Sequence, residues 1–97
     1  NAKVRLMPQR QMREALGILA GHPSALKLAV YSRCAVPTGC GIEHRRMPDK
    51  PAEAAHELFA VLREFDSRGM QLIWIEQPPA SADWEGVLDR LQRAAAA

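Results

Sequence analysis

Cysteine and histidine side chains are the first residues in this sequence that could support chemistry. Cys34, Cys40 and His44 lie close together in the chain, and His22 or His56 could supply a fourth metal ligand. Structural zinc sites usually contain tighter paired spacings such as C-x2-C, and this sequence has none. A catalytic Cys–His pair would also need a third, orienting group, which the sequence does not suggest. We therefore expect no bound metal and no catalytic residue in this chain.

A second candidate is a phosphate-binding loop at Gly39-Cys40-Gly41. A dinucleotide-binding fingerprint requires three glycines at fixed spacing between a strand and a helix. Here the glycines precede a weak strand, so no helix N-terminus follows that could bind a pyrophosphate. We expect a flexible turn at this position and no cofactor bound to this chain.

Charged residues at helical spacing form the third group. Arg63 and Asp66 are one turn apart, as are Asp89 and Arg93, and Arg90 directly follows Asp89. Such charges usually form solvated pairs worth a few tenths of a kcal/mol, but they could instead dock this domain to another. Glu76 ends an expected strand, where ligand sites of α/β folds usually lie. The candidate docking residues are therefore Arg63, Asp66, Glu76, Asp89 and Arg90.

A helix–strand–helix run from residue 49 to residue 95 carries these candidates. The first helix is expected to begin at Asp49, whose carboxylate would cap it, with Pro51 in the first turn. Gly69 is expected to end it in the left-handed conformation. Apolar residues recur at three- and four-residue steps and predict one buried face. That face consists of Ala55, Leu58, Phe59, Leu62 and Phe65.

The strand and the last helix of this run follow from similar patterns. Leu72 to Ile75 is a short apolar run, which is typical of a strand covered on both faces in a parallel sheet. Pro78 and Pro79 cannot donate to a ladder, so the strand ends by Gln77. Ser81 or Asp83 is expected to cap the last helix. Its predicted buried stripe is Trp84, Val87, Leu88, Leu91 and Ala95.

The first half of the chain predicts two strands around a helix, then a weak strand. The strands are 3–7 and 26–32, and the helix between them opens at Pro8 and stops at Gly21. Its predicted apolar face is Met12, Ala15, Leu16 and Leu19. Residues 42–47 carry several charges and predict an edge strand. We favour a helix-free parallel crossover through the loop Cys34–Gly41 into it, with a hairpin as the alternative.

The order β-α-β-β-α-β-α predicts a small Rossmann-like α/β domain. We expect a mostly parallel sheet of about four strands with helices on its faces. The 97 residues suffice for a single domain, 1–97. Because the chain does not begin with Met, we expect it to be a piece of a longer protein.

Composition excludes several classes of partner and location. No stretch approaches the roughly 18 apolar residues of a membrane span, and no signal peptide is evident. The net charge is only +2 and basic residues are spread along the chain, so we expect no direct contact with nucleic acid. Two cysteines do not form a disulfide framework, which favours the reducing cytoplasm.

The second half of the chain resembles a known family. The matching segments are MPDKPAEAAHELFAVLREFDSRG, QLIWIEQPP and WEGVLDRLQRAA. They are similar to the C-terminal domain of bacterial and archaeal threonylcarbamoyl-AMP synthases, the long form of the YrdC/Sua-type proteins, formerly described as putative translation factors. Phe59 stands where the family more often has Tyr, and Trp84 lies where it has a glycine-rich stretch. Carried over by position, the family pattern falls on Leu58-Phe59, Leu62-Arg63, Phe65-Asp66, Glu76, Arg90-Leu91 and Arg93-Ala94-Ala95.

This resemblance implies a function for the whole protein and only a supporting one for this chain. The family makes threonylcarbamoyl-adenylate from ATP, threonine and bicarbonate for tRNA modification. Its catalytic residues belong to an N-terminal YrdC-type domain, which is absent here and which we expect as the partner of this domain. ATP, threonine and bicarbonate would bind there. The alternative is a free-standing nucleotide- or metabolite-binding domain with its ligand near Ser32, Arg33 and Glu76.

Overall fold

The computed structural model describes residues 2–21, 27–33 and 42–96. The elements follow the predicted order, with one short 3-10 helix added before the last α-helix. They are β1 (Lys3–Met7), α1 (Gln9–Gly21), β2 (Leu28–Ser32), β3 (Glu43–Arg46), α2 (Pro51–Ser67), β4 (Leu72–Glu76), η1 (Ala82–Trp84) and α3 (Glu85–Ala96).

The four strands form one sheet in the order β1-β4-β2-β3, and every pairing is parallel. Because β2 and β3 pair in parallel, the predicted parallel connection is confirmed and the hairpin alternative is excluded. β3 lies at an edge, as its charges predicted. The predicted loop Cys34–Gly41, including its Gly-Cys-Gly turn, lies outside the described residues. The predicted layered α/β domain is thus confirmed, with a fully parallel sheet.

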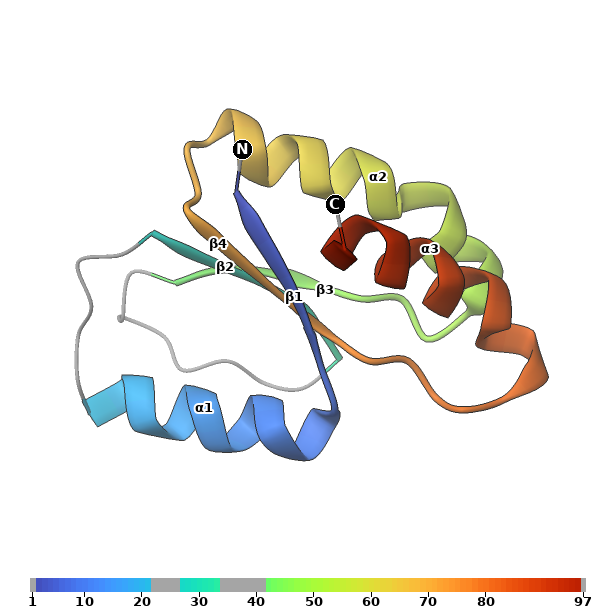
Figure 1. Cartoon of the computed structure of the whole chain (residues 1–97), viewed down its shortest axis with the longest axis horizontal. Coiled ribbons are helices and arrows are strands. Elements are labelled where there is room, and N and C mark those ends of the chain that lie inside the picture. The colour runs from blue at the N-terminus through green and yellow to red at the C-terminus, as the bar shows by residue number, and fades with distance from the viewer. Residues whose placement is uncertain (1, 22–26, 34–41, 97) are drawn as a thin grey trace.

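Helices cover the two faces of the sheet unequally (Figure 1). α2 and α3 lie on one face and α1 lies on the other. Since successive side chains of a strand point to opposite faces, the central strands supply both cores. The larger core, on the α2 and α3 side, is Ala29, Tyr31, Met47, Ala54, Leu58, Val61, Phe65, Ile73, Ile75, Trp84, Val87 and Leu91. The smaller core, on the α1 side, is Met7, Met12, Leu16, Leu28 and Val30.

The buried stripe of α2 differs from the prediction. Ala54, Leu58, Val61 and Phe65 are buried, whereas the Phe59 side chain is 47% exposed. Successive helical residues are rotated by about 100°, so Phe59 lies on the flank of a stripe centred on Leu58. The predicted apolar face was therefore wrong at Phe59. The stripe of the last helix is confirmed at Trp84, Val87 and Leu91, whereas Leu88 and Ala95 are only partly buried.

The two ends of α2 test the predicted caps. Gly69 has φ +75° and its N–H donates to Asp66 O at 3.1 Å, while Met70 N–H donates to Phe65 O at 3.2 Å. These bonds form a Schellman motif, so the predicted glycine stop is confirmed. The prediction that Asp49 caps the helix was wrong. Lys50 is the N-cap, and its ammonium cannot accept a backbone N–H bond. The Asp49 carboxylate pairs with Arg46 of β3 instead.

Candidate functional site

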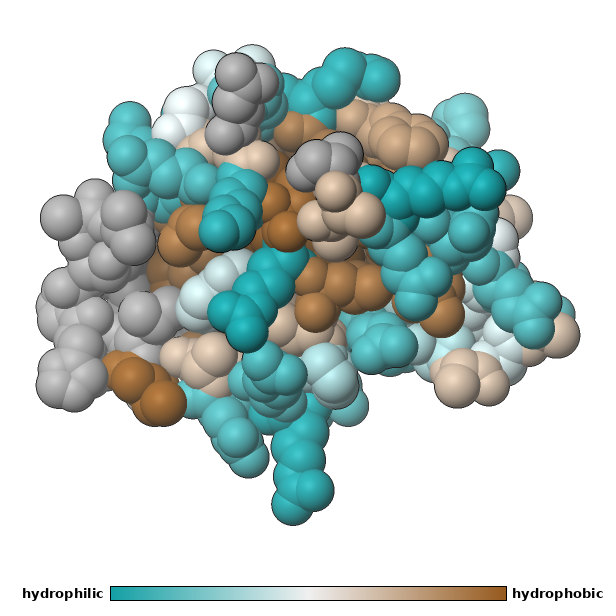
Figure 2. All heavy atoms as spheres, in the orientation of Figure 1, coloured by the Kyte–Doolittle hydropathy of each residue, from teal (hydrophilic) through white to brown (hydrophobic). Residues whose placement is uncertain are grey.

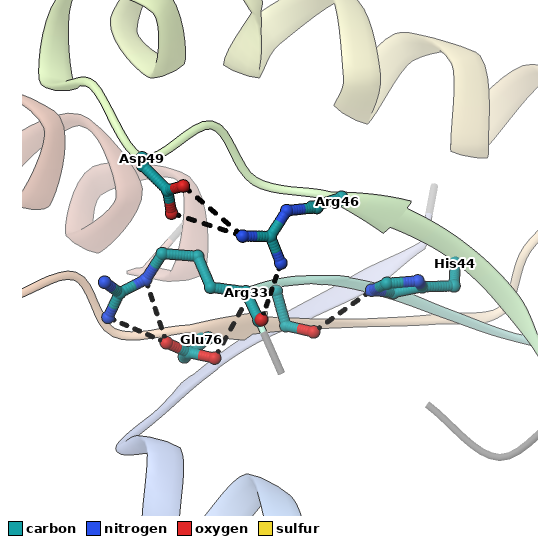
Figure 3. Close-up of polar contacts among 6 residues, drawn as sticks. Arg33, His44, Arg46, Asp49 and Glu76 are labelled. Atoms are coloured by element: carbon teal, nitrogen blue, oxygen red, sulfur yellow. Dashed lines mark hydrogen bonds and ion pairs between the residues drawn. The ribbon is translucent and has the colours of Figure 1, made fainter. Parts of the chain in front are cut away.

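Polar side chains gather at the carboxyl ends of β2, β3 and β4, centred on the buried residue Glu76 (Figure 3). Glu76 ends β4 and is 0% exposed. Its Oε1 accepts the backbone N–H of Arg33 at 3.2 Å, and its Oε2 accepts Arg33 Nε at 3.1 Å. Arg33 Nη2 lies 2.9 Å from the same oxygen. A buried carboxylate is costly unless it is paired and hydrogen-bonded, and Arg33 meets both needs.

The cluster continues to β3 and to the start of α2. Arg46 Nη1 donates to the carbonyl oxygen of Arg33 at 2.9 Å. The other Arg46 nitrogen lies 3.3 and 3.4 Å from the two carboxylate oxygens of Asp49. Ser32 Oγ and His44 Nε2 are 3.2 Å apart. The sequence named Ser32, Arg33 and Glu76 as one possible ligand site, and the structure does bring these three together.

The chemistry open to this cluster is limited by its internal pairing. Both carboxylates in it already hold an arginine, so neither is a free acid or base. An anionic ligand would therefore compete with Glu76 for Arg33 and with Asp49 for Arg46. Among the residues that the structure describes, no group of three His, Cys, Asp or Glu side chains could hold a metal ion. Cys34, Cys40 and His22 lie outside those residues, so the prediction of no metal at them stays a prediction.

A second buried polar residue, Tyr31, lies in β2. Its hydroxyl donates to Glu57 Oε1 of α2 at 2.9 Å. Burial raises the pKa of Tyr31 above its ordinary value, and the hydrogen bond to Glu57 raises that pKa further. The phenol therefore stays protonated at neutral pH. Its hydrogen bond to Glu57 connects α2 to β2 of the sheet. The sequence analysis missed this contact, although a tyrosine inside an apolar strand signals that its hydroxyl needs a partner.

The predicted docking residues fall at three separate places. Arg63 and Asp66 are exposed on α2 and line one shallow groove of about 260 Å³ with Ala2, Val4, Leu62 and Ile73. Asp66 also accepts the backbone N–H of Ala2 at 3.2 Å. Asp89 and Arg90 are exposed on α3. Glu76 is buried in the cluster described above.

The two α3 residues have different surroundings. Asp89 pairs with Arg93 at 3.1 Å, as its helical spacing predicted, and both side chains are more than half exposed. Arg90 lines a groove of about 450 Å³ between the beginnings of α2 and α3. A docking role for Arg63 and Arg90 would therefore involve two different parts of the surface.

Comparisons with known proteins give one match. The family model described as threonylcarbamoyl-AMP synthase, C-terminal domain, matches residues 1–96. No curated protein and no solved structure matches the chain. The family match extends the resemblance beyond the quoted segments and into the first half of the chain. None of the helices in the described part of the chain is long and apolar enough to cross a membrane.

Proposed function

The chain belongs to the threonylcarbamoyl-AMP synthase C-terminal domain family, and on this basis we propose that it is an accessory domain, non-catalytic by itself, of such a synthase. The enzyme would act in tRNA threonylcarbamoyladenosine biosynthesis in the cytoplasm. The observation that carries the proposal is the family match across residues 1–96. ATP, threonine and bicarbonate would bind to an N-terminal YrdC-type domain of the same protein.

The carboxyl edge of the sheet supports a role without catalysis. Adenylate formation requires positive groups on the phosphates of ATP and a site that orients the acyl group. Within the described residues of that edge, Arg33 and Arg46 are already paired with Glu76 and Asp49. The same pairing argues against the alternative function, a nucleotide- or metabolite-binding domain with its ligand at Ser32, Arg33 and Glu76.

Docking to the catalytic domain is the positive part of the proposal. Arg63 and Arg90 are exposed, and each lies beside a shallow groove on the side of α2 and α3. Exposed helical charges contribute little to stability, so docking is the role in which these side chains would affect activity. The domain would then stabilise or gate the synthase site through these two parts of its surface.

The test measures pyrophosphate release from ATP with threonine and bicarbonate present. The 97-residue chain alone should release none, whereas the full protein should release it. In the full protein, Arg63→Ala or Arg90→Ala should change turnover, while the melting temperature of this domain stays within about 2 °C. Arg13→Ala, which removes an exposed charge from α1, is the matched control and should leave turnover unchanged.

Two results would contradict the proposal. Pyrophosphate release by the chain alone would reveal a catalytic site and remove the accessory role. Unchanged turnover in both arginine variants would leave Arg63 and Arg90 as solvated charges and remove the docking surface.

A further inference from the structure

A groove beside the edge strand β1 contains none of the residues of the carboxyl-edge cluster and none of the proposed docking residues. It measures about 390 Å³ and is lined by Lys3, Val4, Arg5, Leu72 and Trp74. The parallel register places Lys3 beside Leu72 and Arg5 beside Trp74. Leu72 and Trp74 are partly buried and pack against the α1-side core. The groove therefore lies on the α1 face of the sheet, at the edge that β1 forms.

The surface around β1 combines apolar and hydrophilic side chains. Figure 1 shows β1 in front of the other strands, so Figure 2 presents this edge of the molecule. Pale and brown side chains lie between teal ones at the centre of that view. An aromatic and aliphatic floor with a basic rim is the composition expected of a site for an anion that carries a flat ring.

Lys3 and Arg5 differ from the arginines of the domain that are paired with carboxylates, and in this respect they resemble Arg63 and Arg90. Arg33, Arg45, Arg46 and Arg68 each lie within 3.3 Å of a carboxylate oxygen. Within the described part of the chain, no carboxylate forms an ion pair with Lys3 or Arg5, and both residues are exposed. The first 13 residues contain four basic and no acidic residues. Positive charge at this edge is therefore not neutralised from within the fold.

The spacing of these groups limits what could bind. Lys3 and Arg5 are two residues apart on one strand, which places their Cα atoms roughly 6.6 Å apart with side chains on the same face. Two such cations can flank one phosphate, and a guanidinium binds phosphate oxygens in pairs. The Trp74 indole can stack on a nucleobase, because every base has an aromatic face. A volume near 390 Å³ lies within the range of small-ligand pockets, about 300–1,000 Å³.

We propose that this groove binds a nucleoside phosphate, with the base against Trp74 and the phosphate between Lys3 and Arg5. The inference does not depend on the docking role, because no docking residue lines this groove; only Val4 lines both this groove and the one beside Arg63. The same chemistry is available from a free nucleotide or from one residue of a single-stranded RNA. Those two sources are separate arms of the test.

The first experiment titrates the ¹⁵N-labelled chain with AMP and follows its two tryptophan indole N–H signals. The Trp74 signal should shift with a Kd of roughly 10 µM to 1 mM, the range for an open site and a ligand of this size. The Trp84 signal should stay in place, because Trp84 is 5% exposed in the core on the opposite face. Adenosine and ribose 5-phosphate should each bind at least about fivefold more weakly than AMP, since each lacks one half of the ligand.

Variants separate this site from general attraction of anions. Arg5→Gln and Lys3→Gln should each weaken AMP binding roughly fivefold or more, the loss expected for one charge-assisted contact. Both side chains are exposed, so the fold should survive these changes. Arg63→Gln, which removes an exposed cation from α2, is the matched control and should bind AMP like the unchanged chain.

The results that would overturn the proposal are specific. The proposal fails if the Trp74 signal shows no saturable shift, or if AMP and ribose 5-phosphate bind equally well. It also fails if Arg5→Gln and Arg63→Gln weaken AMP binding equally. A hexaadenylate RNA identifies the source. Binding at least tenfold tighter than AMP, with a steep loss of affinity in salt, would assign the groove to RNA. Equal or weaker binding would assign it to a free nucleotide.

Discussion

At the scale of single residues, the burial of an ion pair decides how much it contributes. Glu76 is 0% exposed and its Arg33 partner 25%, whereas the Asp89 and Arg93 side chains are 56% and 79% exposed. Water screens the Asp89–Arg93 pair strongly, whereas it reaches the Arg33–Glu76 pair only at the partly exposed arginine. The Glu76 carboxylate also accepts the backbone N–H of Arg33, which connects β4 to the residue that follows β2. The same residue types therefore form a structural connection in one place and a solvated pair in the other.

We predict that Glu76→Gln lowers the free energy of unfolding by about 2–3 kcal/mol. Breaking a buried pair usually costs about 3–5 kcal/mol, and the partial exposure of Arg33 reduces this cost. Asp89→Asn, the matched control, should change stability by at most about 0.5 kcal/mol. Urea unfolding followed by circular dichroism measures both. Equal midpoints for the two variants would mean that the Arg33–Glu76 pair contributes no more than a surface pair.

At the scale of elements, the end of α2 is fixed by the backbone freedom of one glycine. Gly69 has φ +75°, and an added Cβ there would meet only Lys27 Nζ at 3.8 Å. Space is therefore not the constraint at this position. The left-handed conformation is costly for any residue that carries a Cβ. Gly17, within α1, has no positive φ and no atom within 4 Å of an added Cβ.

The two glycines should respond to alanine with opposite signs. Gly69→Ala should destabilise the domain by about 1–2 kcal/mol, because alanine must adopt a positive φ to close the Schellman motif. Gly17→Ala should stabilise it by about 0.5–1 kcal/mol, since glycine in a helix interior costs that much relative to alanine. Thermal melts of both variants provide the measurement. Destabilisation by Gly17→Ala would show that α1 is packed more tightly at Gly17 than the structure indicates.

The elements also show where sequence reasoning succeeds and where it fails. Periodicity and turn residues identified every strand and α-helix, because side-chain spacing reports local geometry directly. They misplaced Phe59, since its exposure depends on how α2 is rotated against the sheet and α3. They also misplaced the cap, because Asp49 had a competing partner in Arg46, which becomes a neighbour only after folding.

Strand order and the candidate sites depend on contacts between distant residues. The placement of β4 between β1 and β2 follows from tertiary packing, which no local pattern encodes. The sequence placed Glu76 at a strand end but could not show that Arg33, 43 positions away, would bind it. The basic residues appeared to be spread evenly along the chain. Only the sheet shows that Lys3 and Arg5 lie beside Leu72 and Trp74 of β4.

At the scale of the whole molecule, two cores depend on one sheet. Along β2, Leu28 and Val30 belong to the α1-side core, while Ala29 and Tyr31 belong to the core beneath α2 and α3. A strand cannot lose its packing on one face and keep its position on the other. With 97 residues, neither core alone is large enough to offset the entropy of an ordered chain. We therefore expect the two cores to unfold together.

The two tryptophans test this expectation, because each reports on one face of the sheet. Trp74 packs against the α1-side core and Trp84 lies in the other. In the Trp84→Phe variant, fluorescence comes from Trp74 alone, and in Trp74→Phe it comes from Trp84 alone. Within each variant, the urea midpoint from fluorescence should equal the midpoint from circular dichroism.

A distant perturbation makes the same test stronger. Leu16→Ala removes a side chain that is 2% exposed beneath α1 and should cost about 2–5 kcal/mol. Added to the Trp74→Phe variant, it should move the Trp84 transition to lower urea by the full amount, although Trp84 lies on the opposite face. A Trp84 midpoint that stays in place while circular dichroism shows an earlier loss of helix would separate the two layers. The α1 layer would then be an independently unfolding cover, and the shared strands would not couple the cores.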